Sequence, residues 1–559
     1  MIVYTPANQR TLLLFRTPFE AALRPENRWV RMAEIVPWDE MAKLFLTKLS
    51  VNQGRPTVDL RIILGALMVA HIEDLSDVRA IEYIQENIYA QYFVGLPSFQ
   101  PDPVFVPSLF VEIRKRLGSG GAAELNERLI NEAAKLEVIK HRRKSDDGHN
   151  TFEVVIDTAP KTSEEVEQDT ITEEVKVGGE QVEITGKAVA DSKPGERNRG
   201  QMAIDATVAP VHISFPTDTA LLANCRRQSE RLLDTIFERF RAYWPVKPRT
   251  YRRDAEKKST NFSKKRRKTK KDIRRALKSE LACLQRNISH LHAMLDLLDE
   301  QQQACPWSHA AWRVFWIIQE IYRQQREMYA SGRRSVKDRI VSIHMPFIRP
   351  IKRGKGGAKN TEFGPKINAT ITEGFAWSHR MDFNAFNESC DLPDQVEGYR
   401  RQFGYYPALV LADEIYWTNA NRKWLKERDI KMNARPKGRK PKNSKYKQEK
   451  LRKRNNQRNV IEGKFGEGKN RYGLDNLRTR LPATIGADVH LTFLAMNLAK
   501  YVREIESGLF SVFYGIATWL MRQKMPLKVL MVRREASAAT CQLAIRELWA
   551  PNLDCRKNF

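Results

Sequence analysis

Five charged residues have the types and the spacing that metal-assisted phosphate chemistry would need. Asp205 follows the apolar residues Met-Ala-Ile, and Asp413 follows an apolar run that ends in Val-Leu-Ala. Such runs are typical of buried strands, and ligand sites in open α/β sheets gather at the carboxyl ends of strands. Carboxylate oxygens are also the ligands that Mg2+ prefers. We therefore expect Asp205 and Asp413 to end two strands beside a metal site; the alternative is that each is only a turn residue.

The other three residues lie in the segment RNVIEGKFGEGK. Arg458, Glu462 and Lys469 are four and then seven positions apart, and a helix would bring them to within roughly 40° of one another at 100° per residue. A guanidinium, a carboxylate and an ammonium group would then share one face. The alternative is a row of surface ion pairs, and three glycines in the segment would weaken a helix.

Helices are predicted over most of the first 145 residues, where apolar residues recur at helical spacing. Ser76 is expected to cap one helix, and Ser108 to cap a later one that Gly118 would end. Residues 219–330 have the same helical pattern. The acidic segment at residues 162–187 is most simply a surface hairpin or linker.

Strands are predicted from residue 339 onward, where the pattern begins to alternate. Residues 339–351 and the segment FGPKINATITEGFAWSHRM, with a glycine-rich turn between them, indicate antiparallel hairpin structure. The run YYPALVLAD is typical of a strand buried on both faces. Helices are expected again from residue 443 to about residue 508.

The surplus of basic residues is concentrated in two internal segments. The 559 residues include 95 Lys and Arg against 67 Asp and Glu, a net charge of +28. Residues 252–280 contain fourteen basic and four acidic side chains, and residues 435–454 contain eleven and one, so each segment carries a net +10. Two internal runs favour a track for nucleic-acid phosphates over a merely solvated surface.

Several other classes of protein are disfavoured. The longest apolar run, residues 62–70, has nine residues, against the ~18–20 that span a bilayer. The N-terminal residues lack the pattern of a secretory signal. Six scattered cysteines without a C-x-x-C pair argue against a disulfide framework and a zinc site. A cytoplasmic protein without a membrane partner is expected.

Together these segments resemble bacterial insertion-sequence transposases of the DDE type. In that group the last acid lies in a Y-x2-R-x3-E-x6-K motif, which Arg458, Glu462 and Lys469 match. The segments SDVRAIEYIQENIYAQYFVGL, FPTDTALL after Asp205 and YYPALVLADEIYWTNANRKW around Asp413 agree, and the resemblance runs from about residue 50 to residue 500. Asn455 departs from the motif, because the family has a tyrosine there that helps to hold DNA.

The resemblance implies an α/β fold: an RNase H-like catalytic core, a mixed sheet with flanking helices, that has a helical insertion and follows an all-α N-terminal domain. The expected units are residues 1–145 for recognition of transposon ends, 146–218 for the start of the core with its acidic insertion, 219–335 for the basic helical insertion, 336–508 for the rest of the core and 509–559 for a tail.

The resemblance also implies the reaction. Such an enzyme binds the terminal inverted repeats of an insertion sequence, cleaves its ends and joins the 3′-hydroxyl to target DNA. Asp205, Asp413 and Glu462 would hold two Mg2+ ions, for which Mn2+ can substitute. Double-stranded DNA is the expected partner, and a homodimer is expected because two ends must be held together. The residues expected to bind DNA are Arg458, Lys469, Lys264, Lys265, Arg266, Arg267, Lys268, Arg452, Lys453 and Arg454.

Alternatives remain at two positions and for the activity. Asp157 also ends an apolar run, but Asp205 is preferred because FPTDTALL follows it. Glu467 could replace Glu462, but only Glu462 has arginine four residues before it and lysine seven after it. The other activities that we consider are a nuclease that cuts without joining and a catalytically inactive, transposase-derived nucleic-acid-binding protein.

Overall fold

The computed structural model describes residues 17, 22–48, 58–136, 138, 198–352, 361–435 and 445–522. Asp157, the acidic segment at residues 162–187 and residues 523–559 lie outside the described residues, as does the glycine-rich turn at residues 353–360.

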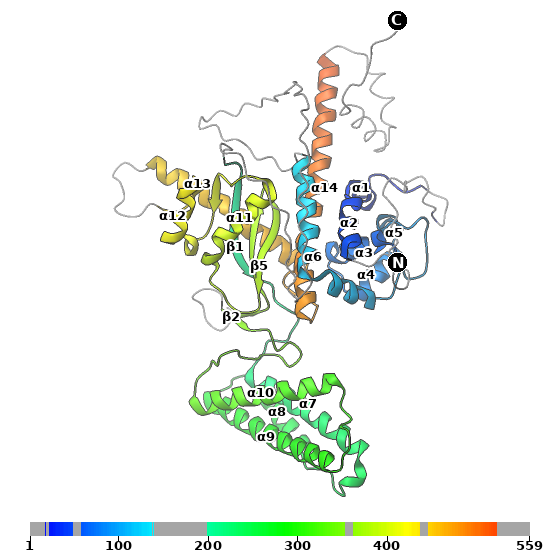
Figure 1. Ribbon diagram of the computed structural model, residues 1–559, viewed down its shortest axis with the longest axis vertical. Helices are drawn as coiled ribbons and strands as arrows, with labels where there is room; N and C mark the ends of the chain where they lie inside the picture. The colour runs from blue at the N-terminus through cyan, green and yellow to red at the C-terminus, as the bar shows by residue number, and fades with distance from the viewer. Residues whose placement is uncertain are drawn as a thin grey trace, which may run out of the picture.

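A five-stranded mixed sheet lies on one side of the main body (Figure 1), in the order β5–β4–β1–β6–β7. Its strands are β1 (Gln201–Val208), β4 (Lys366–Thr372), β5 (Phe375–Asp382), β6 (Leu409–Leu411) and β7 (Lys431–Met432). β1, β4 and β5 pair antiparallel, whereas β6 is parallel to β1 and to β7. All three residues of β6 are buried, as the continuous apolar run predicted. The sheet and its helices give the mixed α/β class expected from the sequence.

The hairpin predicted across the glycine-rich turn is confirmed only for Pro350–Lys352 and Thr361–Phe363, which pair antiparallel. A second antiparallel hairpin joins β4 to β5 and turns at Glu373 and Gly374, with φ of 48° and 86°. The long strand predicted over residues 339–351 is wrong. Only β2 (Pro350–Lys352) pairs, with β3 (Thr361–Phe363). The apolar residues before β2 divide between two cores: Ile340 and Ile343 pack in the core of the helical insertion, whereas Val341 packs in the main core. Their alternation therefore reflects two packing partners and no sheet.

The described residues before β1 form the helices α1 (Arg28–Ile35), α2 (Trp38–Lys48), α3 (Leu60–Ile72), α4 (Asp77–Glu86), α5 (Ile88–Val94) and α6 (Ser108–Lys135). The predicted cap at Ser76 is confirmed, because its hydroxyl accepts a hydrogen bond from the Arg79 amide. The prediction for Ser108 is wrong, since Ser108 lies inside the helix and Pro107 precedes it without a side-chain cap. The backbone confirms the predicted helix end at Gly118, where φ 60° and ψ −177° are not helical; a second helical stretch follows this kink directly, and α6 includes both.

The helices α6 and α14 (Pro482–Arg522) lie between the sheet and α1–α5 (Figure 1). Asn126 of α6 donates a hydrogen bond to the Ala376 carbonyl of β5 at 3.0 Å. Asn497 of α14 donates to Asn126 at 2.8 Å and accepts from the Ala376 amide at 2.8 Å. One hydrophobic core runs from Leu23 to Val502, so the N-terminal helices and the sheet are packed as a single body.

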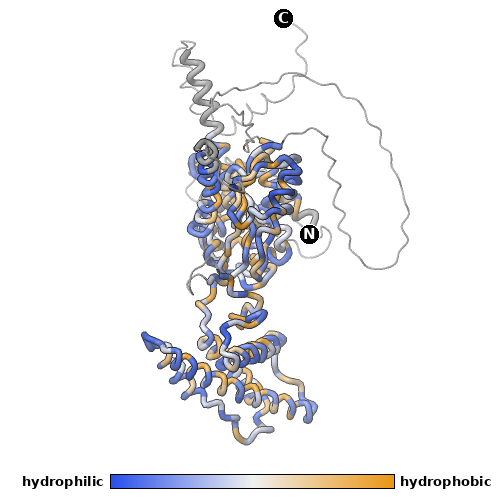
Figure 2. The backbone as a smooth tube through the Cα atoms, turned by 90° about the vertical axis from the view of Figure 1, so that its left-hand side faces the viewer, coloured by the Kyte–Doolittle hydropathy of each residue, from blue (hydrophilic) through white to orange (hydrophobic). Residues whose placement is uncertain are grey.

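Between β1 and β2 the chain forms a separate group of helices: α7 (Asp218–Arg239), α8 (Arg252–Lys264), α9 (Lys270–Glu300) and α10 (His309–Ser331), with the short η3 (Arg241–Tyr243). They have a hydrophobic core of their own and project from the main body in both views (Figures 1 and 2). Arg226, which is fully buried, pairs with Glu230, Glu256 and Glu280 at 2.8–3.0 Å. The pair with Glu230 lies within α7, and the pairs with Glu256 and Glu280 join α7 to α8 and α9.

The remaining elements are η5 (Glu388–Asp391), α11 (Leu392–Phe403), η6 (Glu414–Tyr416), α12 (Asn419–Glu427) and α13 (Lys445–Arg471). Among the described residues, no helix combines the length and the apolar character that crossing a membrane would require.

Candidate active site

Asp205 is the fifth of eight residues in β1, so the prediction that it ends a strand is wrong. The reason lies in the pairing of β1. Its parallel partner β6 stops at Leu411, opposite Ala203, whereas its antiparallel partner β4 accompanies it as far as Val208. Asp205 therefore emerges at the point where one side of β1 has lost its neighbour, beside the carboxyl end of β6.

Asp413 is the second residue after β6, and its Oδ1 atom accepts a hydrogen bond from the Glu414 amide at 2.7 Å. The preceding residue is also fixed, because the Ala412 amide donates to Asn433 at 2.9 Å. Asn433 in turn donates to Asn455 of α13 at 3.0 Å. Asn455, which stands at the tyrosine position of the motif, thus links α13 to the turn that carries Asp413.

The helix α13 packs on β1 and β6 and brings Arg458 to the two aspartates. A guanidinium nitrogen of Arg458 lies 3.7 Å from Asp205 and 3.8 Å from Asp413. Its other terminal nitrogen donates to Glu462, one turn later, at 2.7 Å. Three carboxylates from three separate elements therefore converge on one guanidinium. Lys469 lies further along the helix, where its ammonium group is 3.7 Å from Glu362 of β3.

The glycines of this segment do not interrupt α13, which is helical as far as Arg471. At Gly468 a Cβ atom would lie 3.1 Å from the Met496 sulfur of α14 and 3.2 Å from Leu474. Packing against α14 thus favours a small residue at this position and offsets the low helix propensity of glycine.

Burial raises the pKa of Asp205 to about 6, although the Ala206 amide and Arg458 act in the opposite direction; the negative charge of Asp413 adds to the rise. The Ala206 amide and Arg458 therefore do not fully offset the free-energy cost of removing the Asp205 carboxylate from water. Three carboxylates supply hard oxygen atoms of the kind that Mg2+ and Mn2+ bind. In the arrangement with Arg458 between them, the three carboxylates are not placed to hold a metal ion together. The same is true of every other group of three acidic, histidine or cysteine side chains among the described residues.

Glu467, the alternative to Glu462 as the third acid, does not lie beside Arg458. It pairs with Lys464 at 2.9 Å and lies 3.9 Å from Arg503 of α14. Arg458 therefore contacts Glu462 and not Glu467.

The first basic run lies at the junction of α8 and α9 in the helical insertion. Lys264 ends α8, and residues 264–268 are all exposed. Lys265 is paired with Asp272 at 2.6 Å, and the Lys268 ammonium lies over the Phe262 ring. In the second run Arg452 is exposed and Lys453 lies 3.3 Å from Glu449. The structure thus places the first run in the helical insertion and residues 445–454 of the second run at the start of α13; residues 436–444 lie outside the described residues.

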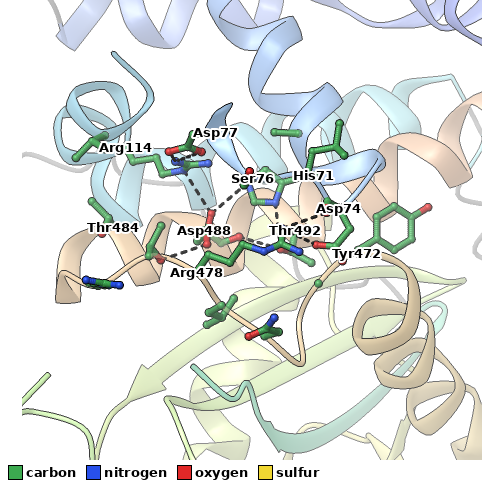
Figure 3. Close-up of a pocket in the computed structure, with 18 of the residues that line it drawn as sticks. His71, Asp74, Ser76, Asp77, Arg114, Tyr472, Arg478, Thr484, Asp488 and Thr492 are labelled. Carbon is green, nitrogen blue, oxygen red and sulfur yellow. Dashed lines mark hydrogen bonds and ion pairs between the residues drawn. The ribbon is translucent and has the colours of Figure 1, made fainter. Parts of the chain in front are cut away.

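Sequence patterns did not indicate a cavity of about 430 Å3 between the N-terminal helices and the segment that follows α13 (Figure 3). At its wall the buried Asp488 of α14 lies 3.3 Å from His71 of α3 and 3.4 Å from Arg114 of α6. Arg114 also pairs with Asp77 at 2.8 Å, and Arg478 with Asp74 at 3.0 Å. These ion pairs join helices α3, α4 and α6 to the chain that leaves the Glu462-bearing helix.

We expect Asp488→Asn to lower the free energy of unfolding by about 1–3 kcal/mol at neutral pH, because His71 and Arg114 lose a buried charged acceptor. Burial alone would raise the pKa of Asp488, but Arg114 and His71 hold it below its usual range. A group with a lowered folded pKa stabilises the protein above its unfolded pKa and loses that effect as the pH falls. Urea unfolding should therefore show the difference from wild type shrinking below about pH 4.

Asp475→Asn is the matched control, because Asp475 is exposed on the same connecting segment. It should unfold like the wild type at every pH. Equal stability of Asp488→Asn and the wild type at neutral pH would contradict the role given to this network.

Two family models match the chain. One, described as a transposase DDE domain, matches residues 410–499, which include Asp413, Glu462 and the basic residues of the motif. The other, described as a transposase domain (DUF772), matches residues 17–116, which span α1–α5 and the start of α6. Both matched families are described as transposase domains, in agreement with the resemblance that the sequence predicted.

A protein of Rhizobium meliloti, described as uncharacterized protein ORF8 in nfe locus, is 34% identical over 112 residues. The matched part is 20% of this chain and 54% of that protein, so the chain spans about half the length of this relative. No solved structure matches the chain.

Proposed function

We propose that this protein binds the terminal inverted repeats of an insertion sequence, cleaves DNA at its ends and joins the 3′-hydroxyl to target DNA. One observation carries the proposal: Asp205 of β1, Asp413 after β6 and Glu462 of α13 converge on a single guanidinium. Carboxylates repel one another, and their collection at one place from separate elements favours a site built for cations.

Asp205, Asp413 and Glu462 are the proposed metal ligands, and two Mg2+ ions are the proposed cofactor, with Mn2+ as a substitute. The oxygen-only donor set fits these hard cations. When bound, the metal would supply Lewis-acid stabilisation of the attacking and leaving oxygens in an in-line displacement. The Ala206 and Glu414 amides, which donate to Asp205 and Asp413, orient the two carboxylates.

Basic residues around this cluster are the proposed contacts for DNA phosphates. Lys469 stands on the same helix as Glu462, and Arg452, Lys453 and Arg454 precede it on α13. The run at residues 264–268 would bind the DNA backbone from the helical insertion. Lysine and arginine at exposed positions bind phosphates without reading sequence.

The proposed catalytic core is RNase H-like. The mixed sheet with flanking helices supports this proposal, as does the helical insertion between β1, which carries Asp205, and β6, which precedes Asp413. The proposed units keep the boundaries expected from the sequence, with end recognition by residues 1–145. The match of a transposase domain to residues 17–116 supports a place for these helices in transposition. A homodimer, with one subunit for each end, is proposed for the DNA complex in the bacterial cytoplasm.

A strand-transfer assay tests the function. The full-length protein is incubated with Mg2+, a labelled duplex that ends in the terminal repeat of the element, and a supercoiled target plasmid. We expect labelled DNA joined to the plasmid. Cleavage without joining would identify a nuclease, and binding without cleavage would identify an inactive DNA-binding descendant. A duplex of equal length without the repeat is the control and should not be joined.

A further inference from the structure

Arg458 stands at the centre of the carboxylate cluster. Its guanidinium lies within 3.8 Å of an oxygen of each of the three acids, and its side chain is only 19% exposed. Among the described residues, Arg458 sets one positive charge against the three carboxylates. Arg458 is therefore the cation that the cluster holds in this structure.

A guanidinium cannot serve as a metal ligand. It has five N–H donors, no acceptor atom, and a charge that it keeps at any physiological pH. A divalent ion in contact with the same three carboxylates would meet a positive charge at short range and would be repelled. No group of three acids among the described residues is placed to hold a metal while Arg458 lies between them.

We propose that Arg458 is a resident counter-ion that competes with divalent metal ions for Asp205, Asp413 and Glu462. The proposal rests on the proposed function, because it takes these acids as metal ligands. Arg458 is on the same helix as Glu462, one turn earlier, and rotation of its long side chain would carry the guanidinium away from the acids. A phosphate group of DNA offers the displaced guanidinium an alternative bidentate partner. Arg458 then offsets part of the negative charge of the cluster before substrate arrives.

The test measures the affinity of the full-length protein for Mn2+ by calorimetric titration in the absence of DNA. Arg458→Gln removes the competing charge and should bind Mn2+ about tenfold more tightly than the wild type, since a charge-assisted pair no longer has to break. Arg471→Gln is the matched control, because it removes the same charge from the exposed end of the same helix. Its Mn2+ affinity should equal that of the wild type.

Equal or weaker Mn2+ binding by Arg458→Gln would overturn the competition and leave the proposed function intact. Circular dichroism would show whether Arg458→Gln is folded. A second variant, Arg458→Lys, tests the proposal independently of Arg458→Gln. Arg458→Lys keeps the positive charge, but a single ammonium group cannot contact all three carboxylates. Its affinity for Mn2+ should lie between those of the wild type and Arg458→Gln. An affinity for Mn2+ no tighter than that of the wild type would also overturn the proposal.

The double variant Asp205→Asn/Arg458→Gln separates failure of this inference from failure of the proposed function. It should lose the tight Mn2+ binding of Arg458→Gln. If it keeps that binding, the metal lies elsewhere, and the assignment of the three acids as metal ligands fails together with the inference.

Discussion

Asp205→Asn, Asp413→Asn and Glu462→Gln should each slow strand cleavage by about a thousandfold or more while changing DNA affinity by less than about threefold. Each substitution keeps the shape of the side chain but removes a charge that a divalent cation needs. DNA binding draws on many basic residues, so one carboxylate changes it little. The measurements are Mg2+-dependent nicking of a labelled terminal-repeat duplex and a gel-shift titration of the same duplex.

Glu414→Gln and Glu467→Gln are the matched controls. Glu414 is next to Asp413 in sequence, but its side chain is 66% exposed and its carboxylate lies 3.7 Å from Arg435. Glu467 is on the same helix as Glu462 and pairs with Lys464. Both variants should cleave at nearly the wild-type rate. Normal cleavage by any of the three variants at Asp205, Asp413 or Glu462 would remove that residue from the proposed site.

Replacing Lys264, Lys265, Arg266, Arg267 and Lys268 together by glutamine should weaken DNA binding on the order of a hundredfold at low salt. The weakening should be similar for terminal-repeat and random duplexes, because binding to phosphates carries no sequence information. The dependence of log affinity on log salt should flatten by about 0.9 for each phosphate that the variant no longer neutralises. Lys265, which is paired with Asp272, should account for less than its neighbours.

The control for this prediction removes the same number of charges elsewhere in the helical insertion and the segment that follows it. It replaces Arg323, Arg326, Arg333, Arg334 and Lys337. A smaller decrease in affinity is expected for this control. If both variants show the same decrease in affinity and the same change in salt dependence, the run at residues 264–268 acts only through overall charge.

Local sequence patterns predicted the strands and helices of the site better than they predicted how these elements are arranged in space. The continuous apolar run before Asp413 predicted the buried β6, and the spacing of Arg458 and Glu462 predicted one helical face. The place of Asp205 depends on where β6 ends beside β1, which is a long-range register that local sequence does not contain. For the same reason nothing in the motif indicated that Arg458 turns toward acids from two other elements.

Long-range packing also explains the errors elsewhere. The alternating pattern over residues 339–351 predicted a strand. The apolar residues of this segment instead pack in two separate hydrophobic cores, which the segment connects. The ion pairs of Asp488 with His71 and Arg114 join elements that are far apart in the chain. A buried aspartate in an apolar helix gives no local signal of its partners. In contrast, the resemblance to insertion-sequence transposases used several ordered segments and is confirmed by two family models.

We propose that Asp205, Asp413 and Glu462 together hold the metal. The most direct measurement is an anomalous difference map, at the manganese edge, of the full-length protein crystallised with terminal-repeat DNA and Mn2+. We predict manganese peaks in contact with carboxylate oxygens of all three residues, with Arg458 withdrawn from among them. Manganese bound elsewhere, or with Asp157 in place of Asp205, would contradict the account.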